Sequence, residues 1–276
     1  MDNPLLSIVI ANYNYGRFLE DAIRSVVFQP GFEKCELIVC DAASTDNSVE
    51  IIKKYGTNIS WWCSEKDKGQ SDAFNKGFGH ARGKYLTWLN ADDLIPEGSL
   101  TKIVAALARN PDCEWFTGNF YRFVEGSGKV CEVGWGPHIY PKWMQHKNSP
   151  IVVFGPTSFF SRKIYEQVGK IDENFHYAMD TDLWVKFIVA GIKQRRINCF
   201  CWAFRMHEGS KTAEFGAHEV GDAAFEKMCA EERLCYQRAG YEVSKVGLLL
   251  LRILRLVDGS FIRGKMLRRV PCAGYQ

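Results

Sequence analysis

Residues 84–98, KYLTWLNADDLIPEG, are predicted to begin as a buried strand and to end in polar residues. The side chains at 85–89 are aromatic, apolar or β-branched, which suits the interior of a sheet. Asn90, Asp92 and Asp93 follow at once, before a turn that contains proline and glycine. Adjacent carboxylates repel one another, so the pattern predicts either a divalent cation with oxygen ligands or a solvated turn that caps a helix.

The same unit, a buried strand that ends in polar residues, recurs along the chain with helices between the copies. Apolar runs predict further strands at residues 5–11, 35–41, 58–63 and 114–120. Helical periodicity and cap residues predict helices at residues 17–28, 44–55, 71–81 and 100–108. Strands that alternate with helices indicate an α/β fold with a Rossmann-like, mainly parallel sheet flanked by helices.

Polar side chains follow four of the predicted strands at their carboxyl ends. They are Asn12 and Asn14, Asp41, Glu65 and Asp67, and Asp92 and Asp93. Ligands of open parallel sheets bind outside the carboxyl ends of the strands. We therefore expect the functional site at this edge of the sheet.

The second half of the chain adds two polar segments. Residues 178–191 have apolar side chains at helical spacing, and Asp180 and Asp182 lie in the first turn, where the helix dipole favours carboxylates. Residues 204–212, FRMHEGSKT, are predicted to form a loop that contains His207.

Length and composition limit the class of protein. A chain of 276 residues, 46% hydrophobic and 24% charged, suits one large α/β domain or a domain with an appendage. Ten cysteines without a C-x-x-C pair predict reduced thiols in a cytosolic protein. We expect no secretory signal peptide, because a basic leader is absent, and no apolar run reaches the roughly 18 residues of a spanning helix.

Basic residues are concentrated at the C-terminus. Residues 245–276 contain seven basic side chains and one acidic, a charge of +6, so the remainder carries −3 of the net +3. Apolar residues cover much of the same segment, which therefore either lies in the interface of an anionic membrane or docks on the preceding domain. Because the remainder is slightly acidic, no nucleic-acid partner is expected.

Two common nucleotide-binding motifs are missing. Neither G-x-G-x-x-G nor G-x-x-x-x-G-K-[ST] follows the first predicted strand. Any phosphates would therefore not lie in a glycine loop, and a metal on Asp93 would hold a diphosphate instead. Asp41, at its own strand end, would then accept hydrogen bonds from a base or a ribose.

Five ordered blocks resemble a known enzyme family. They are SIVIANYN, ELIVCDAASTDNS, SEKDKGQSDAFNKGFGHARGKYLTWLNADD, GKIDENFHYAMDTDLWVKF and FRMHEGSKT, and they span roughly residues 5–215. In this order they resemble the inverting family 2 glycosyltransferases, which have the GT-A fold and use a nucleotide-sugar, most often a UDP-sugar. The resemblance implies that fold, that activity and a divalent metal, Mn²⁺ or Mg²⁺.

The resemblance also implies roles for individual residues. Contacts to the nucleotide-sugar are expected at Ala11, Asn12, Tyr13, Asp41, Asp67, Asp72, Asn75, Lys76 and Asp92. The metal is expected on Asp92, Asp93 and His207, with Asp93 as the more direct ligand. Asp180 is expected to be the catalytic base that takes a proton from the acceptor hydroxyl.

Three motifs depart from the family pattern. Asn90 occupies the first position of the D-x-D-type motif, so Asp92 and Asp93 must supply its charge. Met179 replaces the glutamate that usually precedes the catalytic aspartate, so a carboxylate that would raise the pKa of Asp180 is missing. Asp182 would take that part, or serve as the base itself. The glycine-rich DGGSTD turn of the family is DAASTD here.

We expect a GT-A catalytic domain over residues 1–215 and a helical, basic extension over residues 216–276. Residues 1–115 would bind the nucleotide-sugar and residues 116–215 the acceptor. The acceptor is expected to be a glycan or a lipid-linked precursor of a surface polysaccharide. The chain would be cytoplasmic, or peripheral on the inner face of the membrane through residues 245–276.

Two other functions remain open from the residues. A sugar nucleotidyltransferase would also use strand-end aspartates and a metal, but it should carry a glycine-rich, basic phosphate loop, and ANYNYGR is not one. A non-catalytic carbohydrate-binding protein would not need Asp92, Asp93 and Asp180, all of which are present.

Overall fold

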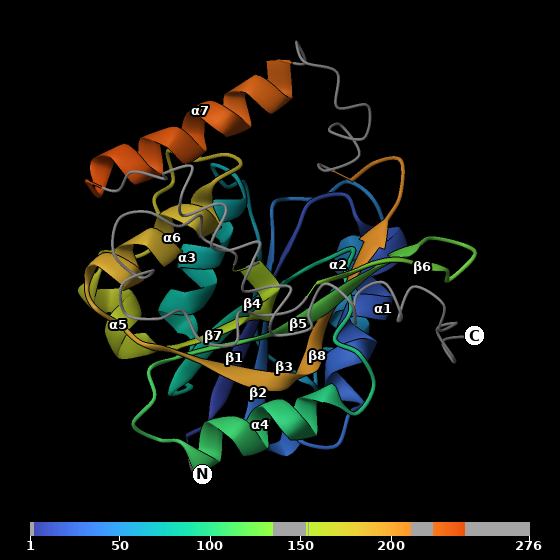
Figure 1. The fold of residues 1–276 in the computed structure, drawn as a ribbon. Helices are drawn as coiled ribbons and strands as arrows, with labels where there is room; N and C mark the ends of the chain where they lie inside the picture. Colours follow the sequence, from blue (N-terminus) through green and yellow to red (C-terminus); the bar gives the residue numbers. More distant parts are fainter. Residues whose placement is uncertain (1–2, 135–152, 154, 211–222, 241–276) are drawn as a thin grey trace.

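The computed structural model of the chain describes residues 3–134, 153, 155–210 and 223–240. In this part of the chain, a central sheet is flanked by helices on both faces (Figure 1). The sheet is mixed but mostly parallel, so the α/β fold predicted from the sequence is confirmed. The basic segment at 245–276 lies outside the described residues.

The strands of the described residues form one sheet. Their bounds are β1 Leu6–Asn12, β2 Cys35–Asp41, β3 Ile59–Ser64, β4 Tyr85–Asn90, β5 Trp115–Val124, β6 Val130–Gly134, β7 Ser158–Ser161 and β8 Gln194–Met206. They pair in the order β3-β2-β1-β4-β7-β5-β6, and β8 also pairs with β5. The first four strands are parallel, β7 is antiparallel to β4 and β5, and β8 is parallel to β5.

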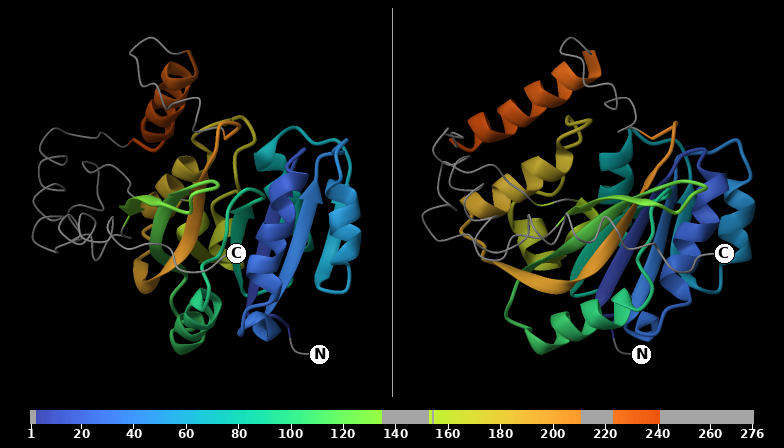
Figure 2. Two further views of the ribbon diagram at one scale, coloured as in Figure 1. Left: turned by 90° about the vertical axis from the view of Figure 1, so that its right-hand side faces the viewer. Right: turned by 45° about the vertical axis from the view of Figure 1, so that its right-hand side comes forward.

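Helices form a layer on each face of this sheet. Their bounds are α1 Gly16–Val27, α2 Ser48–Lys54, α3 Gln70–His80, α4 Ser99–Arg109, α5 Arg162–Gln167, α6 Met179–Val189 and α7 Ala223–Arg238, with short 3-10 turns at Phe32–Lys34 and Gly155–Thr157. Buried side chains join α1, α2 and α4 to one face and α3, α5 and α6 to the other. Helix α7 packs on α6, outside this second layer (Figure 2).

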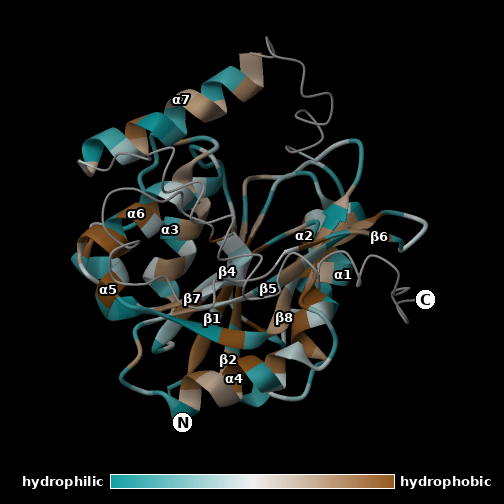
Figure 3. Ribbon diagram, in the orientation of Figure 1, coloured by the Kyte–Doolittle hydropathy of each residue, from teal (hydrophilic) through white to brown (hydrophobic). Residues whose placement is uncertain are grey.

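Alternation along β1 explains the two layers. Leu6, Ile8 and Ile10 belong to the cluster under α1, and Val9 belongs to the cluster under α3. Figure 3 shows hydrophobic residues along the central strands and hydrophilic ones in the surrounding loops. Burial of both faces therefore holds the sheet rigid and leaves its strand ends free for polar chemistry.

The register of the parallel strands brings their polar ends together. Asn12 pairs with Asp41, and Asp41 pairs in turn with Ser64. On the other side of β1, Ala11 pairs with Asn90 at the end of β4. The predicted row of polar strand ends thus lies along one edge of the sheet.

The second half differs from the sequence expectation at two strands. The run predicted at 114–120 continues to Val124, because β5 keeps its pairing with β8 as far as the Val124–Met206 register. For the same reason the first residues of the loop predicted at 204–212 belong to β8. Loop prediction failed there because the partner strand is distant in sequence.

Candidate active site

Asp41 is the centre of a hydrogen-bond network at the ends of β1, β2 and β3. Its Oδ1 accepts from Asn12 Nδ2 at 2.7 Å and from Ser44 Oγ at 2.5 Å. Its Oδ2 accepts from Ser44 N at 3.0 Å and from Ser64 Oγ at 2.6 Å. The carboxylate is buried, so it fixes these three strand ends relative to one another. Its contact with a nucleotide base stays a prediction.

Beside this network, the side chain of Asn12 has an unused polar atom. Its Oδ1 is buried and has no hydrogen-bond partner among the described residues. Buried acceptors are costly when left alone, so this oxygen suits a donor group of a ligand. Its neighbour Tyr13, also predicted to contact the nucleotide, has a side chain that is 60% exposed and therefore accessible.

The turn after β4 encloses Asp93. Its Oδ1 accepts from the backbone N–H of Arg205 at 2.9 Å, and its Oδ2 accepts from Asn90 Nδ2 at 2.8 Å. Burial and the charge of Asp92 raise the pKa of Asp93 well above its usual range. Gln70 Nε2 in turn donates to Asn90 Oδ1 at 2.9 Å and ties α3 to the same turn. Asp93 as the more direct metal ligand stays a prediction, and the geometry favours Asp92.

Asp92 points instead to His207. Its Oδ2 lies 3.1 Å from His207 Nε2, and 17% of its side chain is exposed. The imidazole is buried against the ring of Phe18 at a centroid distance of 4.5 Å. Its Nδ1 has no hydrogen-bond partner among the described residues. Asp92 and His207 thus come together although they are 115 residues apart, and their role as metal ligands stays a prediction.

Arg205 fastens β8 to this turn. Its Nε donates to the backbone oxygen of Asp92 at 2.9 Å, and its Nη2 lies 3.0 Å from Asp21 Oδ2. The guanidinium also lies over the ring of Phe18. These contacts hold the end of β8 against the turn after β4, so that His207, two residues after Arg205, lies beside that turn.

Asp67 and Lys76, both predicted to contact the nucleotide, have partners near the start of α3 and the end of β3. Asp67 Oδ1 accepts from Gly69 N at 2.9 Å, and burial and the nearby charge of Asp72 raise its pKa. Lys76 Nζ lies 2.8 Å from a carboxylate oxygen of Glu65, which follows β3. These side chains face the strand ends, and their contact with a nucleotide stays a prediction.

Asn75 is not brought into the site. Its Nδ2 donates to Ile171 O at 3.0 Å and lies 3.1 Å from a carboxylate oxygen of Glu173. Its Oδ1 accepts from the hydroxyl of Tyr165. The amide is thus engaged with α5 and with the segment between α5 and α6.

Asp180 lies in the first turn of α6. Its Oδ1 accepts from Thr181 N at 2.7 Å. Burial, reinforced by the charge of Glu232, raises the pKa of Asp180 to about 6. Asp182 is more deeply buried than Asp180, and it pairs with Lys186 Nζ at 2.6 Å. Asp180 therefore has no cation beside it within the described part of the chain, which is the condition of a poised base.

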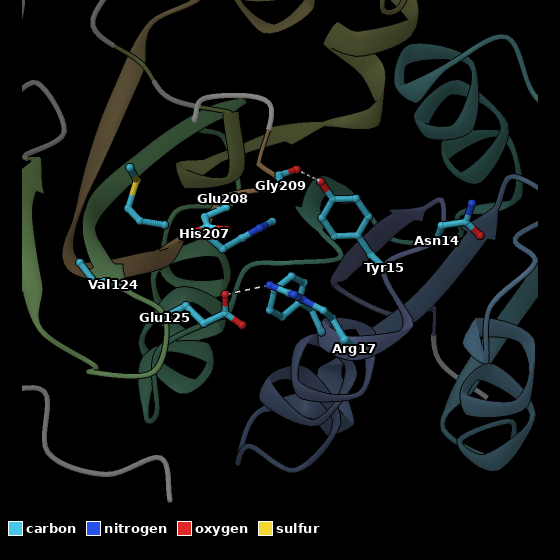
Figure 4. Close-up of a pocket in the computed structure, with 10 residues that line it drawn as sticks. Asn14, Tyr15, Arg17, Val124, Glu125, His207, Glu208 and Gly209 are labelled. Atoms are coloured by element: carbon cyan, nitrogen blue, oxygen red, sulfur yellow. Dashed lines mark hydrogen bonds and ion pairs between the residues drawn. The ribbon is translucent and has the colours of Figure 1, made fainter. Parts of the chain in front are cut away.

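A cavity of about 660 Å³ adjoins His207 (Figure 4). It lies between the start of α1, the hairpin of β5 and β6 and the end of β8, and is lined by Asn14, Tyr15, Arg17, Phe18, Val124, Glu125, Met206, His207, Glu208 and Gly209. Arg17 and Glu125 form an ion pair of 2.8 Å at its rim, and Tyr15 donates to Gly209 O at 2.7 Å. Of the Asp92–His207 pair, His207 lines this cavity.

Comparison with known proteins decides the family. A family model described as Glycosyl transferase family 2 matches residues 7–169. The chain belongs to this family. An uncharacterized glycosyltransferase of Methanocaldococcus jannaschii is 28% identical over 213 residues, which cover 75% of the chain and 72% of that protein. One from Rickettsia typhi is 26% identical over 196 residues, 67% of the chain and 59% of its own length, so the chain spans less than two thirds of that relative.

Solved structures resemble this family 2 chain in fold. Staphylococcus aureus TarS 1–349 in complex with UDP-GlcNAc has a TM-score of 0.58 at 14% identity, over 84% of the chain and 72% of TarS 1–349. The mannosyltransferase PcManGT of Pyrobaculum calidifontis, in complex with GDP-Man and Mn²⁺, has a TM-score of 0.57 at 15% identity, over 93% of the chain and 81% of PcManGT. At such identities the likeness shows the GT-A fold.

The roles of three side chains in the site of this family 2 chain were not predicted from the sequence. Gln70 supports Asn90, Arg205 anchors the end of β8, and Glu232 of α7 provides the carboxylate near Asp180 that had been assigned to Asp182. Gln70 lies in one of the five family blocks and had a local signal. Arg205 and Glu232 act on residues more than 50 positions away, and no local pattern shows such contacts.

Proposed function

We propose that the chain is an inverting glycosyltransferase that moves a sugar from a nucleotide-sugar to an acceptor hydroxyl. The observation that carries the proposal is the division of its carboxylates. Asp92 is paired with His207 at the strand ends, whereas Asp180 lies unpaired on α6 with its pKa raised to about 6. The Asp92–His207 pair suits a cation that stabilises the negatively charged leaving group, and Asp180 suits the role of proton acceptor.

Asp92 and His207 are the residues proposed to hold a divalent cation. Asp92 Oδ2 and His207 Nε2, which face one another at 3.1 Å, are an oxygen and a nitrogen donor that fit Mn²⁺ or Mg²⁺. The described residues contain no cluster of three or more acidic, histidine or cysteine ligands. Mg²⁺ commonly completes two protein ligands with waters and substrate phosphates. When bound, the cation would stabilise the negative charge of the departing nucleoside diphosphate.

Asp180 would accept the proton of the attacking hydroxyl. The hydroxyl oxygen forms a bond to the anomeric carbon while the bond from that carbon to the diphosphate oxygen breaks, which inverts the configuration. The proton passes to the Asp180 carboxylate, and the electron pair of the broken bond leaves with the nucleoside diphosphate. The N–H of Thr181 keeps one carboxylate oxygen in place.

The donor is proposed to be a UDP-sugar, held at Asn12, Asp41 and Asp67 on the strand ends. TarS binds UDP-GlcNAc and PcManGT binds GDP-Man with Mn²⁺, so the fold accommodates more than one base. The acceptor is proposed to be a glycan or a lipid-linked glycan in surface polysaccharide assembly, with peripheral membrane contact through 245–276. None of the helices in the described residues is long and apolar enough to cross a membrane.

The test is a screen of UDP-, GDP- and dTDP-sugars with Mn²⁺ or Mg²⁺ that measures released nucleoside diphosphate. We expect release with one nucleotide class, a loss on adding a chelator, and a loss in Asp92→Asn. Asp112→Asn, which changes an exposed carboxylate at the opposite end of the sheet, is the matched control and should behave as the wild type. If none of these donors binds or reacts, the proposal is wrong.

A further inference from the structure

Helix α7 places a carboxylate against the loop that leads into α6. Glu231 Oε2 accepts hydrogen bonds from three consecutive backbone N–H groups, those of His176 at 3.0 Å, Tyr177 at 2.7 Å and Ala178 at 3.1 Å. Charge-assisted bonds of this kind are among the strong ones, and three on one oxygen define the path of the loop closely. A residue far along the chain thus fixes the backbone just ahead of Asp180.

This contact replaces a missing local cap. The N-cap of α6 is Ala178, whose side chain offers no oxygen to the first turn. Glu231 supplies the negative charge that the N-terminal end of a helix favours, but it does so from another helix. The start of α6, and with it the direction of Asp180, therefore depends on how α7 is docked.

Other contacts of α7 fall on the same loop. Arg238 Nη1 lies 2.8 Å from Asp172 Oδ2, and the Arg238 guanidinium also lies over the ring of Phe175. Cys235 is buried and its Sγ lies 3.7 Å from Ala178 O. The segment 172–178 is thus tied to α7 at both its ends, and Glu231 makes the bonds nearest to the base.

We propose that Glu231 is a positioning residue for the transfer reaction, which holds residues 176–178 so that the Asp180 carboxylate meets the acceptor hydroxyl. The inference rests on the proposed function, because it assigns Asp180 the proton of the acceptor. Small displacements of a catalytic group have large effects on rate, of about 100-fold for about 1 Å. Glu231 is accordingly expected to affect turnover more than donor binding.

A test of Glu231 must leave the other charged and titratable groups around Asp180 in place. Glu232 and Cys235 approach from α7, and Asp182 with its partner Lys186 lies on α6 itself. Glu231→Ala leaves all four in place and removes only the bonds to the loop. A loop released in this way admits water to Asp180, which lowers the pH at which activity appears.

The experiment compares full-length Glu231→Ala and Glu231→Gln with the wild type, using the donor found in the screen. In Glu231→Ala, we expect kcat to fall by about 10- to 100-fold, with the KM of the donor and the Kd of the nucleoside diphosphate within about twofold. The midpoint of the pH–rate profile should shift downward. Glu231→Gln keeps an acceptor oxygen and should restore most of the lost kcat.

Two variants on the same helix separate positioning from stability. Glu226→Gln changes an exposed carboxylate one turn earlier and should keep the wild-type kcat. Arg238→Gln removes the other tie of α7 and should lower the Tm without shifting the pH profile. If Glu231→Ala lowers the Tm but leaves kcat and the pH midpoint unchanged, the positioning role is wrong. A wild-type chain inactive with every donor would instead overturn the proposed function.

Discussion

Two aspartates one residue apart show how local partners decide chemical roles. Asp182 is buried and paired with Lys186 at 2.6 Å, so its charge is neutralised within α6. Asp180 has the N–H of Thr181 at 2.7 Å but no cation, and burial raises its pKa to about 6. A paired carboxylate holds its charge at little cost, whereas an unpaired one removed from solvent opposes folding and is available for a proton.

Asp180→Asn should therefore abolish transfer and stabilise the protein. Loss of the base is expected to lower kcat by at least about 100-fold, with nucleotide binding unchanged. The same change removes a partly buried charge whose pKa is about 6 instead of 3.8, so the free energy of unfolding at pH 7 should rise by about 3 kcal/mol. Donor turnover and denaturant unfolding measure the two effects.

Asp182→Asn is the matched control for this substitution. It leaves Lys186 without its partner, so we expect the free energy of unfolding to fall by about 1–3 kcal/mol. The proton acceptor would remain, so much of the transfer activity should survive in the folded fraction. Full activity in Asp180→Asn together with its loss in Asp182→Asn would reassign the base.

The rate of transfer should depend on the ionisation of Asp180. Because a base must be deprotonated, kcat is expected to rise with pH and to reach half its plateau near pH 6, the raised pKa of this carboxyl. An aspartate with its ordinary pKa would give half the plateau near pH 4. The measurement is kcat between pH 4.5 and 8 at saturating donor and metal, and a flat profile would contradict the assignment.

At the scale of elements, the turn from β2 to α2 contains a strained residue. Ala43 has a φ of 56°, in the left-handed region that favours glycine. It lies in the DAASTD stretch, where the family pattern has glycine, and its turn leads to the Ser44 groups that bond to Asp41. The strain is therefore stored next to the expected nucleotide site.

Ala43→Gly should stabilise the protein. Relief of the left-handed conformation, about 1–2 kcal/mol, exceeds the entropy that glycine adds to the unfolded chain, so a net gain of about 0.5–1 kcal/mol is expected. Its neighbour Ala42 has no such positive φ, so Ala42→Gly should destabilise by a similar amount. Thermal unfolding of both variants checks the pair, and a loss of stability in both would contradict the explanation.

The elements that were predictable are those with local causes. Apolar runs and helical periodicity located the strands and helices of the first half, and the polar ends of β1, β2 and β4 pointed to the edge where Asn12, Asp41 and Asp92 now lie. The extent of β8 was missed because its pairing with β5 decides it, and β5 lies about 80 residues earlier.

At the scale of the whole molecule, the features that the sequence did not predict depend on tertiary contacts between distant residues. The family resemblance favoured Asp93 as the metal ligand, but the structure encloses Asp93 beneath Arg205 and leaves Asp92 beside His207. The carboxylates of α7 reach the start of α6 across more than 50 residues. The domain boundary at 215 stays a prediction, although α7, beyond it, is docked on the catalytic half.

Carboxylates whose pKa values shift in opposite directions on folding affect how the stability of the chain depends on pH. Burial alone would raise the pKa of Glu36, but bonds from Ser7 and from Arg82 outweigh it and lower that pKa. Burial raises the pKa of Asp180 to about 6 and that of Glu232 in the same direction. The lowered group stabilises the fold above the unfolded value of about 4.5 and loses that effect as pH falls.

The raised groups act in the other direction. Between the unfolded pKa and about pH 6, the native state binds more protons at Asp180 than the unfolded chain, so stability falls as pH rises through that range. Through Asp180, the metal-free chain should therefore be less stable at pH 7 than at pH 5. Asp180→Asn should remove about 1 kcal/mol of the decline from pH 5 to 7, and Glu36→Gln should flatten the acid side while costing about 2 kcal/mol at pH 7. Urea unfolding from pH 3.5 to 8 with a chelator present measures all three curves. A maximum at pH 7 that neither variant moves would show that these two carboxylates do not set the pH dependence.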